Sequence, residues 1–243
     1  MRLLAASGGQ VRTWMAAAFV TVGCTTTEAP DTPDAATPPG FELVLAEGFD
    51  DEGSLAHWTF SDPEAWTWHA DGALELVGES DYAPPHRSPR SIALLDRPLA
   101  GDFVLEADLM QTGREYAHRD LCLFFAFEGA ADFYYIHLAT TPDPNAHNAF
   151  LVHDAPRRPL APVAEEGVDW GSEVWHRVRL ERLGSAIRVF FDGDEVIACE
   201  DATLGAGRIG VGSFDDQGRF DKLRVWAPPG EVPPTGPSPF AGP

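Results

Sequence analysis

The sequence predicts an all-β domain in which antiparallel strands form a sandwich or a barrel. Apolar and polar residues alternate with a period of two over much of the chain, which is the pattern of half-buried strands. The segment 102–110, for example, places Phe103, Leu105, Ala107 and Leu109 on one face. No segment of ten or more residues has the apolar spacing of a helix. The apolar strand faces must therefore cover one another.

Short strands are predicted one after another along the chain. Their ranges are 42–46, 73–77, 91–95, 102–110, 121–127, 133–139, 150–153, 175–183, 207–214 and 220–226, with two more inside 186–199. The last two form a hairpin, because Asp192-Gly193-Asp194 separates two β-rich runs and glycine tolerates the positive φ of a tight turn.

The first 24 residues have the features of an export signal. Arg2 and Arg12 supply positive charge, and the apolar run 14–23 has the length of a signal-peptide core rather than of a membrane span. The run ends in TVGC, which resembles the lipobox of bacterial lipoproteins, so we expect lipidation at Cys24. An ordinary secretory peptide and a short anchor are the alternatives. Thr25 follows the cysteine, so no Asp signal for inner-membrane retention is present. The predicted location is the outer membrane or the cell surface.

Composition divides the rest of the chain into three parts. Residues 25–40 are rich in Thr, Pro and Ala and predict a flexible tether, and residues 227–243 predict a disordered Pro-rich tail. The folded domain is expected at 41–226. Two cysteines lie inside it, Cys122 and Cys199; buried free thiols are the favoured interpretation, and a disulfide of an exported protein is the alternative.

The charge of the chain limits its partners. The formal net charge is −21, from 38 acidic and 17 basic residues. A nucleic-acid partner is excluded on this ground, because phosphate neutralisation requires a basic face. A polyanionic glycan would also be repelled unless a local arginine cluster or a bound cation compensates.

Several motifs resemble a known superfamily. The closing segments WHRVRL, AIRVFFDG and GRIGVGS, and the opening segments FELVLAEGFDD, HWTF and DGALELVG, resemble jelly-roll domains of the concanavalin A-like lectin and glucanase superfamily. The opening is most similar to the 3-keto-disaccharide hydrolase and laminin-G-like branch. The resemblance implies a jelly-roll sandwich of two antiparallel sheets with a ligand groove on the concave sheet face. The fold hosts lectins, glycosidases, lyases and adhesion modules, so it does not select an activity.

A pair of carboxylates in 106–111 resembles part of a glucanase site. The sequence EADLMQ comes close to the Glu-x-Asp-x-x-Glu strand of bacterial glucanases, in which two glutamates flank the glycosidic bond. Here Gln111 stands at the last position and cannot exchange a proton at neutral pH. We therefore expect Glu106 and Asp108 to lie on a strand face that points to water.

The segment 134–158 carries the strongest candidate site. Alternation assigns Tyr134, Ile136 and Leu138 to the core and places Tyr135 and His137 on an open sheet face. The next loop would bring His147 and Asn148 to the rim, and two arginines follow the next strand. The predicted catalytic residues are Tyr135, His137 and His147, and the predicted substrate-binding residues are Arg119, Asn148, Arg157 and Arg158.

Three interpretations of these residues remain open. In the first, His or Tyr exchanges a proton while Arg or Asn neutralises charge developing on the substrate, as in a polysaccharide lyase or a keto-glycoside-type hydrolase. In the second, aromatic rings stack on sugar rings and polar groups bind their hydroxyls without catalysis. In the third, the residues only pack, and the domain serves adhesion or another interaction.

Metal binding is a separate question. Asp215 and Asp216 lie in FDDQGRFD and offer the oxygen ligands that suit a structural Ca²⁺, although an Asp-rich turn has the same composition. A transition-metal site from His137, His147 and His153 matches no known spacing. No cofactor is expected to be required. Together these features predict a monomeric lipoprotein that binds or processes an extracellular polysaccharide or oligosaccharide and meets the membrane only through its lipid anchor.

Overall fold

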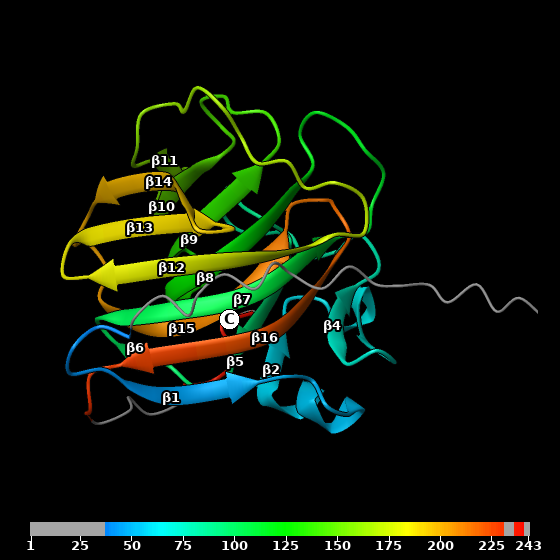
Figure 1. Cartoon of the computed structure of the whole chain (residues 1–243), viewed down its shortest axis with the longest axis horizontal. Coiled ribbons are helices and arrows are strands. Elements are labelled where there is room, and N and C mark those ends of the chain that lie inside the picture. The colour runs from blue at the N-terminus through cyan, green and yellow to red at the C-terminus, as the bar shows by residue number, and fades with distance from the viewer. Residues whose placement is uncertain (1–36, 231–235, 241–243) are drawn as a thin grey trace, which may run out of the picture.

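The computed structural model describes residues 37–230 and 236–240 and consists of two stacked antiparallel sheets (Figure 1). The first, called the β7 sheet, contains β1 (Glu42–Glu47), β3 (Trp66–His69), β4 (Ala73–Leu76), β7 (Phe103–Gln111), β12 (Trp175–Leu183), β13 (Ala186–Phe191), β14 (Asp194–Glu200) and β16 (Gly218–Ala227). The second, called the β8 sheet, contains β2 (Trp58–Phe60), β5 (Ser91–Leu95), β6 (Leu99–Ala100), β8 (Asp120–Gly129), β9 (Asp132–Ala139), β10 (Asn148–His153), β11 (Arg158–Pro159) and β15 (Ala206–Ser213).

Strand order shows that the chain crosses repeatedly between the layers. The β7 sheet runs β14-β13-β12-β7-β16-β4-β3, with β1 also paired to β16. The β8 sheet runs β11-β10-β9-β8-β15-β5-β2, with β6 also paired to β15. Every strand predicted from the sequence is present, and the structure adds short strands such as β2, β3, β6 and β11.

Helical structure in the described residues is confined to two 3₁₀ segments, η1 (Glu52–His57) and η2 (Pro63–Ala65). Each begins at an aspartate whose carboxylate accepts a main-chain hydrogen bond, Asp51 from Gly53 and Asp62 from Glu64. The prediction that no helix of ten residues forms is correct for these residues. None of the helices in the described part of the chain is long and apolar enough to cross a membrane.

The β13–β14 hairpin forms as its sequence predicts. Its loop is Asp192-Gly193, and both residues have positive φ, at 50° and 96°. Two consecutive positive φ values define a type I′ turn, whose twist matches that of the flanking strands. Glycine adopts this conformation at little cost, and aspartate is one of the side chains that tolerate it.

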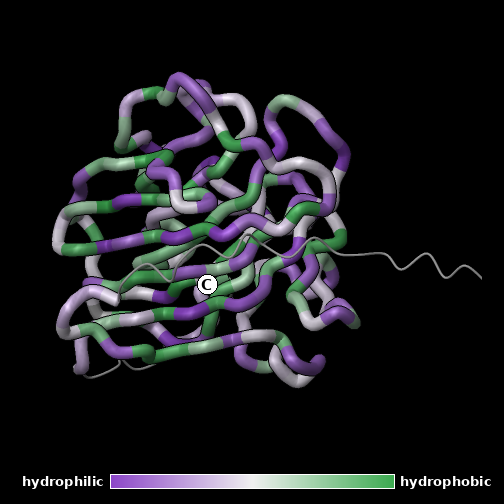
Figure 2. The backbone as a smooth tube through the Cα atoms, in the orientation of Figure 1, coloured by the Kyte–Doolittle hydropathy of each residue, from purple (hydrophilic) through white to green (hydrophobic). Residues whose placement is uncertain are grey.

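The main core lies between the sheets. Alternate residues of facing strands fill it, including Leu105 and Leu109 of β7 and Tyr134, Ile136 and Leu138 of β9. Figure 2 shows the alternation as hydrophobic and hydrophilic stretches that follow one another along the strands. The predicted inward face of β9 is therefore confirmed.

A second apolar cluster covers the outer face of the β8 sheet. Its buried members are Ile92, Leu94, Cys122, Phe124, Phe127, Phe133, Tyr135, Phe150 and Val152. Half-buried aromatic residues from three loops pack over it, namely Tyr82, Phe214 and Phe240. This outer face is thus apolar and covered, and it is not the open polar face that alternation alone suggests.

Part of the expected C-terminal tail contributes to that cover. The ring of Phe240 lies 5.7 Å from that of Phe127 and 5.3 Å from that of Tyr82, both in edge-on geometry. Arg208 donates hydrogen bonds to the carbonyl oxygens of Gly236 and Pro237, at 2.7 and 3.2 Å. Residues 236–240 therefore pack against the domain although their composition predicted disorder.

Candidate functional site

A pocket of about 310 Å³ opens at one end of the outer face of the β8 sheet. It lies where β8 begins and β9 ends, and loops from five parts of the chain surround it. The residues that line it are Arg87, Tyr116, His118, Asp120, His137, Asp143, Asn145, Ala146, Arg157, Phe214 and Asp215. Two arginines, three aspartates and two histidines thus face a space whose volume is at the lower end of the range for small-molecule sites, about 300–1,000 Å³.

Strand register places the residues of the pocket floor. Asp120 and Cys122 are two residues apart on β8, so their side chains leave the strand on the same side. Cys122 pairs with His137 across the β8–β9 ladder, and His137 pairs in turn with Asn148 of β10. Directly paired residues point to the same face of a sheet, so all four belong to the outer face.

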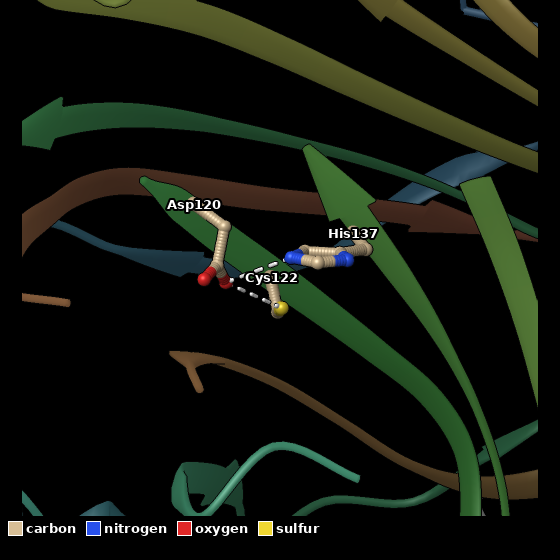
Figure 3. A group of neighbouring side chains, drawn as sticks. All are labelled: Asp120, Cys122 and His137. Carbon is tan, nitrogen blue, oxygen red and sulfur yellow. Dashed lines mark hydrogen bonds and ion pairs between the residues drawn. The ribbon is translucent and has the colours of Figure 1, made fainter. Parts of the chain in front are cut away.

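The floor is a compact Asp-Cys-His group (Figure 3). The thiol of Cys122 donates to Asp120 Oδ2 at 3.2 Å, and the same oxygen lies 3.4 Å from Nε2 of His137. His137 Nδ1 lies 3.3 Å from the carbonyl oxygen of Asn145, which can only accept, so Nδ1 carries a proton. The imidazole is therefore oriented from its two sides, by Asn145 and by Asp120.

The Asp120 carboxylate is buried but well supported. The hydroxyl of Ser213 and the main-chain N–H of Phe214 donate to Oδ2 at 3.2 and 3.4 Å. Burial by itself would raise the pKa of Asp120, but His137 and the hydrogen bonds from Cys122 and Phe214 hold that pKa below its ordinary value. Burial, together with the Asp120 charge, raises the pKa of the Cys122 thiol well above its ordinary value.

A second carboxylate lies directly behind the floor. Asp216 Oδ2 accepts from the hydroxyl of Tyr116 and from the main-chain N–H of Asp120, both at 2.8 Å. Burial and the nearby Asp120 charge raise the pKa of Asp216 to about 6. Burial, and then the hydrogen bond to Asp216, raise the pKa of Tyr116 as well. Tyr116 is thereby fixed at the pocket wall.

Arg157 forms the wall on the side of the apolar cluster. Its guanidinium lies over the rings of Phe150 and Phe214, 5.0 and 4.8 Å from their centroids, and its Nη1 donates to the Tyr135 hydroxyl at 2.8 Å. Cation–π contact and the hydrogen bond together hold the planar fork of this arginine in one orientation. Arg157 thus lines the pocket, and its role in binding a substrate stays a prediction.

Tyr135 lies on the predicted face, but that face is not open. Its exposed fraction is 0%, it stacks on Phe150 at 5.0 Å, and its hydroxyl receives the Arg157 hydrogen bond. Burial raises the pKa of Tyr135 far above its ordinary value. The expectation of an exposed ring is wrong, because loops and aromatic side chains cover the outer face of the sheet. Tyr135 supports the pocket wall from behind.

The two residues predicted for the rim are also buried. Asn148 donates to the carbonyl of Ala161 at 2.9 Å and accepts from its N–H at 3.0 Å, so it fastens the segment that follows β11. His147 is 1% exposed and has a positive φ of 51°. Burial, and then repulsion from His137, lower the pKa of His147 to about 4. Neither side chain lines the pocket.

The remaining predicted arginines have partners elsewhere. Arg119 donates to the carbonyl of Gly171, and Arg158 pairs with Asp201 at 2.9 Å. Neither lines the pocket, so Arg157 is the only one of the three predicted arginines that reaches it. Of the predicted catalytic and substrate-binding residues, the structure brings His137 and Arg157 to the pocket and Tyr135 into contact with its wall.

The predicted calcium ligands point to different partners. Asp215 pairs with Arg90, whereas Asp216 accepts from Tyr116 and from the main chain of Asp120. Both carboxylates are thus engaged by protein donors, and these contacts do not bring the two carboxylates together around one position. A structural Ca²⁺ stays a prediction.

The glucanase-like carboxylates are neutralised by arginine. Glu106 is 4% exposed and Asp108 2% exposed, so the expected contact with water is wrong. Arg179 Nη1 lies 2.6 Å from Glu106 Oε1, and Arg177 binds both oxygens of Asp108, at 2.8 and 3.2 Å. Gln111 faces the opposite side, and its amide donates to the carbonyl of Asp120 at 2.6 Å. The outer face of the β7 sheet is therefore a network of paired charges.

Asp120 and Cys122 are the functional candidates that the sequence did not reveal. Their alternation in RDLCLF places them on one face, but pairing with His137 required the β8–β9 register, which the sequence does not supply. Cys122 and Cys199 are both free; Cys122 lies on β8 and Cys199 on β14, in different sheets. Cys24, with the predicted export signal, lies outside the described residues.

Comparisons with known proteins identify the fold. No protein-family model matches the sequence, and no curated protein sequence matches it either. Similar solved structures include the carbohydrate-binding module CBM66 from Bacillus subtilis, with a TM-score of 0.56 and 16% identity over 70% of this chain and 96% of that one. An endo-β-galactosidase from Clostridium perfringens that releases GlcNAcα1-4Gal has a TM-score of 0.54 and 14% identity, over 83% and 66% of the two chains.

A third similar structure is the κ-carrageenase of Pseudoalteromonas carrageenovora in complex with an oligotetrasaccharide. Its TM-score is 0.50, with 12% identity over 81% of this chain and 99% of that one. At these identities the likeness concerns the fold alone. With the two-sheet topology, it confirms that the chain is an all-β jelly-roll sandwich of the concanavalin A-like type.

Proposed function

We propose that this domain binds the end of an extracellular glycan in the pocket above Asp120 and His137. The observation that carries the proposal is the pocket itself. It combines an aromatic surface, Phe214, with donors and acceptors that are held in place by partners outside it, among them Arg157 and Tyr116. Sugar recognition needs this combination, because a pyranose has apolar C–H faces and a rim of hydroxyls.

The charges of the pocket favour a neutral sugar. Arg87 and Arg157 stand against Asp120, Asp143 and Asp215, so the lining has no excess of positive charge. Vicinal hydroxyls can donate to a carboxylate and accept from a guanidinium at the same time, whereas the aspartates would repel a uronate or a sulfate. The net charge of −21 adds to that repulsion.

The comparisons support a glycan as the partner only at the level of the fold. The structures named above are a carbohydrate-binding module and two enzymes that act on glycans. One fold thus carries both binding and cleavage, so the activity must be argued from the site.

A glycan array probed with the labelled full chain tests the proposal. We expect retention of at least one neutral oligosaccharide with an affinity between micromolar and millimolar. Arg87→Ala should abolish that retention, because Arg87 is an exposed residue of the pocket rim and its removal leaves the core intact. The matched control is Arg188→Ala, which removes an exposed arginine from the other sheet. Absence of any hit for the wild-type chain would contradict the proposal.

Glycan cleavage is the second candidate, and one contact favours it. Asp120 Oδ2 lies 3.4 Å from Nε2 of His137, and a carboxylate beside an imidazole is a pair that general acid–base catalysis can use. A lyase would produce unsaturated sugar ends and a hydrolase new reducing ends. Absorbance at the ultraviolet band of the unsaturated product and a reducing-end assay, run in parallel on the array ligand, distinguish cleavage from binding.

The export signal completes the proposal. Lipidation at Cys24 would tether the domain through residues 25–40 to the outer membrane or the cell surface, where polymeric glycans are met. The chain would act as a monomer. Incorporation of labelled palmitate that is lost in Cys24→Ser tests the anchor, and sedimentation equilibrium of the non-lipidated variant tests the monomer.

A further inference from the structure

We propose that Asp120, Cys122 and His137 form a binding site for one divalent transition-metal ion, with Zn²⁺ the best match. The three side chains converge on a common point beneath the glycan pocket (Figure 3). The ion would bind to the protein without any sugar present, so the proposed metal site does not depend on which glycan binds.

Strand pairing places the three side chains together. Asp120 and Cys122 alternate onto one face of β8, and His137 lies opposite Cys122 on β9. All three side chains therefore stand on the central ladder of the β8 sheet rather than on loops. A site built on paired strands is held in place by their hydrogen bonds, so the ligands require little ordering when an ion binds.

The distances between the candidate ligand atoms suit a single ion. The candidate ligand atoms all lie within 4.8 Å of one another, with Asp120 Oδ2 3.2 Å from Cys122 Sγ and 3.4 Å from His137 Nε2. Ligand atoms of a tetrahedral zinc site are separated by about 3.3–3.8 Å, given bonds of about 2.0–2.3 Å. An ion could therefore be accommodated by small side-chain rotations.

His137 has one ring nitrogen without a hydrogen-bond partner. Nδ1–H donates to the carbonyl of Asn145, but buried Nε2 has no hydrogen-bond partner, although its side chain is only 7% exposed. The contact of Nε2 with Asp120 lies at ion-pair distance without hydrogen-bond geometry. A histidine whose Nδ1–H binds a main-chain carbonyl and whose Nε2 is directed into a ligand group has the arrangement of a metal ligand.

Neighbouring groups hold the Asp120 carboxylate in place. Ser213 and the N–H of Phe214 donate to the ligating oxygen of Asp120, as second-layer partners of metal-bound carboxylates do. Asp120 and His137 also line the pocket, so the fourth position of a tetrahedron faces the space assigned to the sugar. Three protein ligands with one open position would allow the ion to bind water or a sugar hydroxyl.

The ligand types select the metal. A thiolate and an imidazole beside one carboxylate suit a borderline ion such as Zn²⁺ or Co²⁺, whereas Ca²⁺ and Mg²⁺ prefer an all-oxygen shell. Binding would form a metal–sulfur bond at Cys122 and release the thiol proton to solvent, and no oxidation or reduction is involved. The group differs from the predicted calcium ligands, Asp215 and Asp216.

Cobalt titration provides the test. The full chain carrying Cys24→Ser, without an added histidine tag, is freed of metal with a chelator and titrated with Co²⁺. We expect one equivalent to produce a thiolate-to-cobalt charge-transfer band and the visible bands of tetrahedral Co²⁺, and one equivalent of Zn²⁺ to abolish them. Native mass spectrometry of the zinc-loaded chain should show one ion per chain.

Variants identify the ligands. Cys122→Ser should remove the charge-transfer band, and His137→Gln should weaken Zn²⁺ binding at least tenfold. The matched controls are Cys199→Ser, which removes the other domain thiol, and His153→Gln, which removes an exposed histidine; both should bind as the parent chain does.

The proposal is overturned if the metal-free parent chain, shown to be folded by circular dichroism, gives no cobalt band, or if Cys122→Ser keeps that band. The first of these outcomes is measured on the parent chain, so it does not depend on whether a variant folds. Retained glycan binding in the metal-free chain would leave the proposed function standing, so the two claims fail separately.

Discussion

Arg157 donates a hydrogen bond of 2.8 Å to the hydroxyl of Tyr135, and this contact joins the pocket wall to the apolar cluster on the outer face of the β8 sheet. The tyrosine is fully buried, so its hydroxyl is available to the arginine and not to a ligand. A residue that the sequence suggests as a catalyst thus positions a neighbouring residue of the site.

Tyr135→Phe and Tyr135→Ala should therefore differ sharply. The first removes only a hydrogen bond and should cost about 0.5–1.5 kcal/mol of stability while loosening Arg157. The second also removes a buried ring and should cost about 3–5 kcal/mol. Urea unfolding of both variants measures these losses. A Tyr135→Ala chain as stable as the wild type would show that the ring is not buried.

The paired charges on the β7 sheet should matter for stability and not for ligand binding. Glu106→Leu removes a carboxylate that pairs with the buried Arg179, while Glu181 still pairs with it, and should cost up to about 3–5 kcal/mol. Glu195→Ala breaks an exposed pair with Arg188 and serves as the control, with an expected loss below about 1 kcal/mol. Glycan affinity at low temperature should be unchanged in both. A Glu106→Leu variant that is stable but has lost glycan binding would place the site on this sheet.

The packed part of the tail should stabilise the domain. Phe240→Ala removes a ring that covers Phe127 and Tyr82, and we expect a loss of about 1 kcal/mol because the ring is only half-buried. Leu43→Ala, at an exposed position of β1, should change stability by a few tenths of that value. Chemical denaturation of both variants gives the comparison. Equal, negligible losses would mean that residues 236–240 do not hold their place in solution.

A substitution at Asp221 should stabilise the fold at neutral pH. Burial, and then the neighbouring Asp108 and Asp50 charges, raise its pKa to about 6, against the opposing effect of Lys222. A carboxyl group whose folded pKa lies above the unfolded value of 3.8 supports the fold only at low pH, and that support is lost as pH rises from about 4 to about 6.

Asp221→Asn should consequently be more stable than the wild type at pH 7 by about 1 kcal/mol, once partial exposure is allowed for. The advantage should disappear at pH 3, where the wild-type carboxyl is protonated in both states. Thermal melts of the two chains at both pH values measure it. If Asp221→Asn were less stable than the wild type at pH 7, the idea that burial of the Asp221 charge destabilises the fold would be contradicted.

Local alternation predicted most strands and the inward face of β9, because the side-chain period of a strand is a local property. It could not show that the opposite face is covered, since the covering residues Tyr82, Phe214 and Phe240 are remote in the sequence. Tyr135 was therefore expected to be exposed. The predicted rim residue Asn148 is buried for the same reason, because the segment that follows β11 binds its side chain.

The candidate site shows the same limit. His137 and Arg157 were found because unusual residues gather in one segment, and that clustering is visible in the sequence. Asp120 and Cys122 were not found, because their partner His137 reaches them only through the register of β8 and β9. Similarly, the arginines that neutralise Glu106 and Asp108 lie about 70 residues further along the chain and meet them only through the pairing of β7 with β12.

A crystal structure of the chain with the best oligosaccharide from the array tests the central claim most directly. The account predicts one terminal sugar unit in the pocket, with its ring against Phe214 and its hydroxyls within hydrogen-bond distance of Arg157 and Arg87. A sugar bound instead to the outer face of the β7 sheet, over Glu106 and Asp108, would contradict it.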